Sequence, residues 1–179
     1  MSATEPPPRI RTPRLTLRGL LAADAAPMAR LANDPGVARM TTSIPHPYGE
    51  AQAEAFIARA RAMDPAHEPV LAIEGEAGAF MGCLGFHPSR QDWVGPWSEL
   101  GYWLGRPFWS QGFMTEAVTA AMAWISTRRR LIASGHFADN EASARVLIKT
   151  GFLYTGAVTP RHSLARGAEA ATRMMIWLA

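Results

Sequence analysis

The sequence has a single cysteine, Cys83, and a single lysine, Lys149, in 179 residues. One cysteine excludes a disulfide framework and a cysteine-based metal site, and it is typical of a protein from a reducing compartment. The five histidines show neither HExxH nor another spacing typical of metal ligands. We therefore expect a protein without a metal.

Long apolar runs are also missing. No stretch reaches the ~18 consecutive apolar residues of a transmembrane helix, and the polar, Pro-rich segment Met1–Pro13 lacks the apolar core of a signal peptide. These absences predict a cytoplasmic location and no membrane partner. The net charge is only +3, and the one arginine run, Arg128–Arg130, fits a helix C-terminus better than a nucleic-acid patch. The charge favours a polyanionic small ligand, and we expect no nucleic-acid partner.

The pattern of apolar residues predicts one α+β domain over residues 1–179, with no repeat or linker. Short apolar or alternating runs predict strands at 15–18, 70–74, 79–86, 99–104, 131–137, 152–158 and 172–178. Helical spacing predicts helices at 24–33, 50–63, 113–127 and 140–150. Segments rich in polar residues, proline or glycine predict loops at 40–49, 87–97 and 159–171.

The segment ELGYWLGRPFWSQGFMTEA, residues 99–117, joins a strand, a tight turn and a helix N-terminus. Unpaired backbone N–H groups and the positive end of the helix dipole then point the same way, which makes an anion site. Gly112 lets the backbone approach a phosphate closely. The segment contains neither GxxxxGK[ST] nor GxGxxG, so taken alone an ordinary strand-to-helix connection is the better explanation.

A second motif, NEASARVLIKTGF at Asn140–Phe152, has the form N-x-x-S-x-x-x-L-x-K-x-G-F. The order of elements and the two motifs together resemble the GCN5-related N-acetyltransferase (GNAT) superfamily. Within it they resemble the RimJ/RimL-type branch, which acetylates ribosomal-protein N-termini, and TPRLTLRGL at Thr12–Leu20 is similar to that branch's opening strand. The resemblance implies a three-layer fold with a mixed, mostly antiparallel sheet of six to seven strands and about four helices. It also implies a splayed strand pair that holds acetyl-CoA.

The resemblance further implies an N-acetyltransferase that uses acetyl-CoA as co-substrate and no metal. The acetyl group would pass directly to a primary amine, on a protein N-terminus or a small molecule, in an enzyme that is a monomer or a homodimer. Many relatives carry a tyrosine seven residues after the motif's asparagine as the acid for the leaving thiolate, and here that residue is Leu147. A non-catalytic CoA-binding sensor or scaffold is therefore the alternative function.

The resemblance also assigns residues to CoA. The family's pyrophosphate loop reads [Q/R]-x-x-G-x-[G/A], and its marked places are Trp109, Gly112 and Met114 here, a departure that binding through backbone N–H groups tolerates. Asn140 either caps its helix or meets the pantetheine, and both roles can coexist. The expected cofactor contacts are Tyr102, Trp103 and Leu104 through the strand, Trp109, Gln111, Gly112, Phe113, Met114 and Thr115 in the loop, and Asn140 and Ser143.

Two residues are expected to act in catalysis. Glu99 shares a strand face with Gly101 and Trp103 by the period of two, and a carboxylate whose pKa burial raises can accept the proton of an amine. An idle rim glutamate with His87 or water as the base is the alternative. Ser143 takes the role of the missing tyrosine as acid for the thiolate. Cys83, in the middle of an apolar strand, is expected to be a buried, inert thiol.

Overall fold

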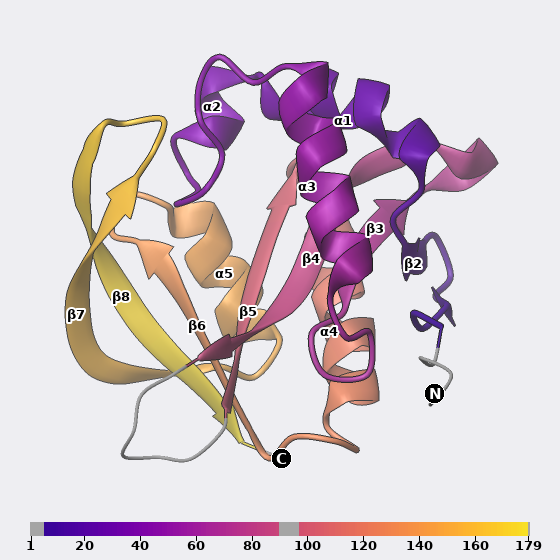
Figure 1. The fold of residues 1–179 in the computed structure, drawn as a ribbon. Coiled ribbons are helices and arrows are strands. Elements are labelled where there is room, and N and C mark those ends of the chain that lie inside the picture. Colours follow the sequence, from indigo (N-terminus) through magenta and orange to yellow (C-terminus); the bar gives the residue numbers. More distant parts are fainter. Residues whose placement is uncertain (1–5, 90–96, 179) are drawn as a thin grey trace.

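The computed structural model describes residues 6–89 and 97–178. In these ranges eight strands form one sheet in the order β1-β2-β3-β4-β5-β6-β8-β7 (Figure 1). Neighbouring strands run antiparallel except β5 and β6, which run parallel. The strands are β1 (Ile10–Arg11), β2 (Thr16–Gly19), β3 (Val70–Glu74), β4 (Phe80–Ser89), β5 (Trp97–Leu104), β6 (Leu131–Phe137), β7 (Leu153–Ser163) and β8 (Ala168–Leu178).

Helices cover both faces of this sheet (Figure 1). Five α-helices lie in the described ranges: α1 (Ala25–Ala32), α2 (Pro35–Ala38), α3 (Glu50–Ala62), α4 (Phe113–Ile125) and α5 (Glu141–Lys149). One apolar core lies between the sheet and α4 and α5, and a second lies between the sheet and α1 and α3. No helix in the described part of the chain combines the length and apolar character needed to cross a membrane.

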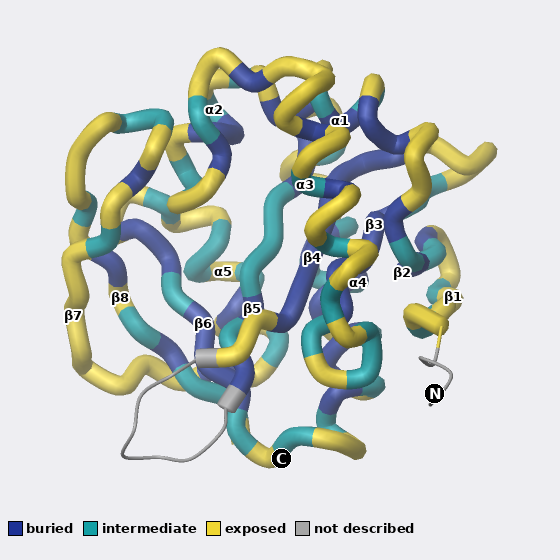
Figure 2. Tube along the Cα trace, in the orientation of Figure 1, coloured by how far each residue is buried: buried dark blue, intermediate teal, exposed yellow. Residues whose placement is uncertain are grey.

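The burial pattern explains why the central elements form. In β3 and β4 both faces of the sheet are covered, so successive residues are buried and the strands read as continuous apolar runs (Figure 2). Helix α4 buries one stripe at helical spacing, which contains Met114, Ala117, Val118, Ala121, Met122 and Ile125. This stripe is core, as the sequence predicted.

The predicted α+β fold with a mixed, mostly antiparallel sheet is confirmed, with one more strand and one more helix than expected. The added elements, β1 and α2, have two and four residues, too few to show a period. Helix α2 is set by its first residues instead. Asp34 accepts a hydrogen bond from the N–H of Gly36 at 2.7 Å, and Pro35 occupies the first turn, where its missing N–H costs nothing.

The predicted loop at 159–171 is wrong. These residues belong mostly to a long hairpin of β7 and β8, and only 164–167 form its turn. Strand β7 is the edge of the sheet and is exposed along nearly its whole length, so it shows no apolar alternation, and an edge strand tolerates Pro160 (Figure 2). The predicted loop at 87–97 is also too long, because β4 extends to Ser89 and β5 begins at Trp97, and residues 90–96 lie outside the described ranges.

Candidate active site

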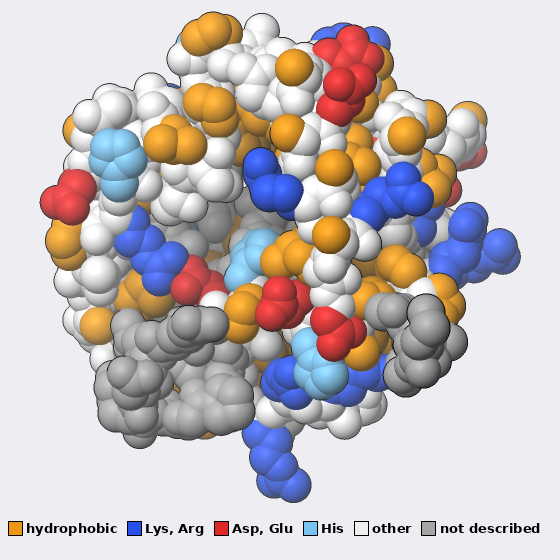
Figure 3. All heavy atoms as spheres, in the orientation of Figure 1, with side chains coloured by type: hydrophobic (Ala, Val, Ile, Leu, Met, Phe, Trp, Pro, Cys, Tyr) orange, Lys and Arg blue, Asp and Glu red, His pale blue; other side chains and the backbone are white. Residues whose placement is uncertain are grey.

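A cleft opens where β5 and β6 separate. The two strands pair only over residues 98–99 of β5 and 132–133 of β6. One side-chain bond, from Ser134 Oγ to the carbonyl of Leu100 at 2.9 Å, extends the contact by one residue. The cleft is lined by the starts of α4 and α5, by the 40–45 loop and by α3. Figure 3 shows the hollow on this face, with a histidine and neighbouring acidic and basic side chains near its border.

The open edge of β5 faces this gap. Backbone polar groups of a strand alternate in direction, so those of residues two apart point the same way. The carbonyl of Leu100 points toward β6, where it accepts its hydrogen bond, and the carbonyl of Leu104 accepts from Trp109 Nε1 at 2.6 Å. Tyr102 lies between them, so its N–H and C=O point into the gap. Those of Trp103 point toward β4. Of the three strand residues predicted to meet the cofactor, Tyr102 and Leu104 therefore face the gap through their backbone.

The turn before α4 presents N–H groups. Ser110 and Gly112 have left-handed backbone, with φ of +60° and +79°, and α4 begins at Phe113 without a side-chain cap. The N–H groups of Phe113, Met114 and Thr115 therefore have no partner inside the helix and lie at the positive end of its dipole. The φ of Gly112 is one that residues with a Cβ rarely adopt. This local geometry is that of the anion site predicted from the sequence.

Arg14 adds a positive charge to this turn, and the sequence analysis missed it. Its Nε donates to Glu116 Oε2 at 2.7 Å and its Nη1 donates to the carbonyl of Gln111 at 3.0 Å. The guanidinium also lies over the Phe113 ring, 4.4 Å from the centroid. Burial raises the pKa of Glu116, but hydrogen bonds from Thr12 and Arg14 outweigh it, so the net pKa is lowered. Glu116 is thus an ionised anchor that holds Arg14 beside the turn.

The other residues of the predicted loop have structural contacts. The indole N–H of Trp109 donates to the carbonyl of Leu104, and the Gln111 side chain donates to the carbonyl of Pro107 at 2.9 Å. Met114 is buried in the core. The loop therefore offers its backbone rather than these side chains to the cleft.

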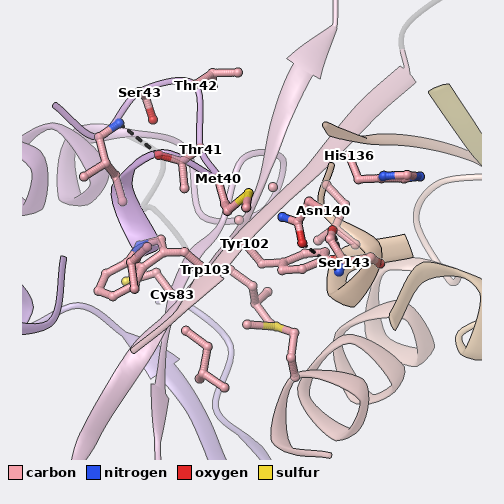
Figure 4. Close-up of a pocket in the computed structure, with 18 of the residues that line it drawn as sticks. Met40, Thr41, Thr42, Ser43, Cys83, Tyr102, Trp103, His136, Asn140 and Ser143 are labelled. Carbon is pink, nitrogen blue, oxygen red and sulfur yellow. Dashed lines mark hydrogen bonds between the residues drawn. The ribbon is translucent and has the colours of Figure 1, made fainter. Parts of the chain in front are cut away.

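The start of α5 brings two hydroxyl groups together (Figure 4). Asn140 caps the helix by accepting from the N–H of Ser143 at 3.1 Å, which confirms its capping role. Ser143 Oγ lies 2.8 Å from the hydroxyl of Tyr102. Burial raises the pKa of Tyr102 above its usual value, although the hydrogen bond with Ser143 opposes the shift. Leu147, in place of the tyrosine of many relatives, is fully buried in the core.

Glu99 is engaged by an arginine that the sequence analysis also missed. Arg161 of β7 donates to both carboxylate oxygens: Nη1 to Oε1, and Nη2 to Oε2 at 3.1 Å. His87 lies opposite Glu99 in the β4–β5 register. Although part of the His87 ring is open to solvent, burial against the sheet lowers its pKa, and the negative charges of Glu99 and Glu68 only partly oppose this. Neutral His87 is therefore the dominant form at pH 7.

The two predicted catalytic residues lie on opposite sides of the sheet. Side chains alternate along β5, so Glu99 and Trp103 face α1 and α3, whereas Tyr102 faces α4 and α5. Figure 4 shows Tyr102 pointing toward Ser143, and Trp103 pointing away from it. In β5 the gap between β5 and β6 begins directly after Glu99, so it opens between these two sides of the sheet.

The tip of the β7–β8 hairpin is tied to the 40–45 loop above the cleft. Ser163 Oγ donates to the carbonyl of Thr41 at 2.9 Å, and the N–H of Leu164 donates to the carbonyl of Thr42 at 3.1 Å. Arg166 Nε donates to the carbonyl of Arg39 at 2.7 Å. These bonds give the side of the cleft next to Glu99 and His87 a border of fixed backbone.

Two further residues that line the cleft have simple structural roles. Cys83 is buried, and burial raises the pKa of its thiol, which therefore stays protonated and unreactive at neutral pH. The ring nitrogens of His136 lie 2.8 Å from the carbonyl of Phe137 and 2.9 Å from the Tyr154 hydroxyl, so both are satisfied. Residues 6–89 and 97–178 contain no cluster of side chains suited to a metal ion.

A family model described as an acetyltransferase (GNAT) domain matches residues 14–153. The chain belongs to the GNAT acetyltransferase family. It is thereby an N-acetyltransferase by class, and the match includes the turn before α4, Glu99 and Ser143. No curated protein matches the chain.

Solved structures of acetyltransferases share its fold. An acetyltransferase from Salmonella typhimurium, described as modifying the N-terminal serine of ribosomal protein L7/L12, is 17% identical, with a TM-score of 0.80 over 96% of this chain and 99% of the other. RimJ of Mycobacterium smegmatis, solved with CoA-disulfide, is 20% identical, with a TM-score of 0.77 over 96% and 86%. The microcin C7 self-immunity acetyltransferase MccE, solved with acetyl-CoA and AMP, is 16% identical, with a TM-score of 0.78 over 94% of each chain. The chain thus has the fold of the RimJ/RimL-type enzymes.

Proposed function

We propose that this enzyme moves the acetyl group of acetyl-CoA directly onto a primary amine in the cytoplasm, without a metal. The gap beside Tyr102 is the observation that supports it most, because it is bordered by Ser143 on one face of the sheet and by Glu99 on the other. A reaction at a thioester in this gap needs no covalent enzyme intermediate. The inert thiol of Cys83 agrees with direct transfer.

The residues around the gap fit CoA. The unpaired N–H groups at the start of α4 and the Arg14 guanidinium suit a pyrophosphate, since both supply positive charge within one turn. The backbone N–H and C=O of Tyr102 suit the amides of the pantetheine arm, which needs one donor and one acceptor on a strand edge. CoA would supply the activated acetyl group, and the chain would bind and orient it.

On the other face, we assign Glu99 the role of the base. An amine attacks only after it loses its proton, and α-amino groups are close to their pKa at neutral pH. A carboxylate has about four acceptor positions, so the two bonds from Arg161 leave positions for the N–H of an acceptor or for a bridging water. Arg161 holds Glu99 in one orientation, and neutral His87 beside it is the competing proton acceptor.

The acceptor we favour is the free N-terminus of a protein or peptide, with a small-molecule amine as the next choice. The border between the hairpin tip and the 40–45 loop suits a narrow, extended chain end better than a folded surface. Among the enzymes of like fold, one modifies a ribosomal protein's N-terminal serine, which supports the first choice. The acetyltransferase MccE, solved with acetyl-CoA and AMP, keeps a small-molecule acceptor open as the second choice.

A thiol-release assay with acetyl-CoA tests the proposal. Three acceptors are compared: a peptide with a free N-terminus, the same peptide with a blocked N-terminus and a free lysine, and a small aliphatic amine. We expect release of CoA with the first peptide and far less with the blocked one. The two bonds that Arg161 makes to Glu99 also suit a non-catalytic CoA-binding sensor. Binding of CoA without release for any acceptor would establish that alternative.

A further inference from the structure

The hydroxyl groups of Tyr102 and Ser143 form a hydrogen-bonded pair that has two protons to donate. Tyr102 Oη lies 2.8 Å from Ser143 Oγ and 3.2 Å from the Ser143 carbonyl. Each hydroxyl has one proton to donate, and the carbonyl can only accept. The two residues come from β5 and α5 and are 41 positions apart in the sequence.

Two hydrogen-bond arrangements have Tyr102 as the donor to Ser143, either to its Oγ or to its carbonyl. In the first, Tyr102 donates to Ser143 Oγ, and the Ser143 proton is free to point into the cleft. In the second, Ser143 donates to Tyr102, and Tyr102 donates to the Ser143 carbonyl, so no proton points into the cleft. Of these two, only the first offers a hydrogen bond to a negative charge in the gap, so such a charge favours it.

We propose that Tyr102 is a positioning residue that turns the Ser143 proton toward the sulfur of CoA, which makes Ser143 a hydrogen-bond donor to the leaving thiolate. This inference rests on the proposed acetyl transfer. When the carbon–sulfur bond breaks, its electron pair stays on sulfur, and the Ser143 hydroxyl stabilises the charge. Tyr102 polarises that hydroxyl through the bond it donates.

Both hydroxyls keep their protons in this step. An aliphatic alcohol is a far weaker acid than a thiol, and burial makes Tyr102 a weaker acid than an ordinary phenol. The thiolate therefore takes its proton from water, which balances the proton that the acceptor amine gives up through Glu99. Many relatives have a tyrosine acid at the position of Leu147. Here Ser143 would stabilise the thiolate as a hydrogen-bond donor instead, and Leu147 packs in the core.

The test measures the thiol pKa of CoA bound to the enzyme, from the ultraviolet absorbance of the thiolate, and needs no acceptor. A hydrogen bond to a charged group is worth ~1.5–3 kcal/mol, so the bound thiol should have a pKa about 1 to 2 below that of free CoA. Ser143→Ala and Tyr102→Phe should each bring it back toward the free value. The control is Tyr48→Phe, which also deletes a buried phenol oxygen but one that lies 3.9 Å from Met28 Sδ, and it should leave the bound thiol unchanged.

Turnover of the same variants shows whether Tyr102 acts through Ser143. With any accepted amine, Ser143→Ala should lower kcat by roughly 10- to 100-fold and Tyr102→Phe by roughly 3- to 10-fold, with nearly unchanged affinity for CoA. The double variant should equal Ser143→Ala within about twofold, because the two residues form one unit.

Three results would overturn the inference alone: a thiol pKa that neither substitution changes, a response to Ser143→Ala without one to Tyr102→Phe, or a full loss from Tyr102→Phe in the Ser143→Ala background. A wild-type protein that does not bind CoA would instead overturn the proposed function, and this inference with it.

Discussion

A negative charge at position 112 should destroy the proposed phosphate site without unfolding the protein. We compare Gly112→Asp with Gly112→Asn, which has the same size and shape but no charge. Both side chains tolerate the left-handed backbone of this residue better than others do, so the conformational cost is shared and cancels. A Cβ at this position meets only Arg14 Nη2, at 3.5 Å, so both substitutions fit.

The expected difference follows from Coulomb's law. Two unit charges about 4 Å apart interact by about 4 kcal/mol at an effective dielectric constant near 20, which corresponds to roughly 10³ in Kd. Screening by salt reduces this, so we expect Gly112→Asp to bind CoA roughly 10²–10³-fold more weakly than Gly112→Asn. A new carboxylate would also pair with Arg14 and draw it from the ligand, which acts in the same direction.

Calorimetric titration with CoA at two salt concentrations measures both variants and the wild type. The ratio of the Kd of Gly112→Asp to that of Gly112→Asn should fall as the salt concentration rises, because screening weakens the repulsion. Equal losses in the two variants would mean that shape or strain, and not charge, is responsible. CoA binding by Gly112→Asp at the level of Gly112→Asn would therefore refute the assignment of this turn to the pyrophosphate.

Three further predictions concern the base, the thiol and an ion pair. Glu99→Gln should lower kcat by roughly 10²–10⁴-fold with little change in CoA affinity and remove the acidic limb of the pH profile, whereas normal turnover with loss in His87→Gln would identify His87 as the base. Cys83→Ala should keep most of its turnover, since the buried thiol takes no part, and isolation of an acetylated enzyme free of CoA would contradict this. Asp34→Asn keeps the cap of α2 but loses the ion pair with Arg106, whose hydrogen bonds lower the pKa of Asp34 to about 2. The charged pair's contribution, which solvent keeps small at this exposed site, is present above pH ~4 and lost as the pH falls toward 2. The urea-unfolding free energies of wild type and variant should therefore converge at low pH. A difference that stays constant with pH would contradict a stabilising role for the Asp34–Arg106 ion pair.

Local physics explains which parts of the site could be predicted from the sequence. The turn before α4, which we propose binds phosphate, depends on a strand, a glycine with positive φ and a helix start, all within residues 99–117. The Asn140 cap depends on a residue three positions away. The apolar stripe of α4 depends only on helical spacing. Such signals lie within a few residues of one another, so a single sequence contains them, and two motifs in order were enough to indicate the family.

Long-range contacts explain what could not be predicted. Arg14 and Glu116 are 102 positions apart, Glu99 and Arg161 are 62 apart, and each pair meets because of the strand order. No period or spacing indicates such a partner, because any of the many arginines is an equal choice in the sequence. The failure at 159–171 has a related cause, since a strand exposed on both faces has no apolar pattern to read.

The sequence by itself determined the fold class, the turn before α4 and the position of Ser143 at the start of α5, because backbone geometry and helix caps arise from neighbouring residues. Only the tertiary structure decided what the side chains in the cleft touch. Parallel pairing of β5 with β6 stops after two residues, and this break opens the gap and frees the backbone of Tyr102 between the face of Ser143 and the face of Glu99. Where a sheet stops pairing depends on how both strands pack against the helices above and below them, and that is a property of the whole chain.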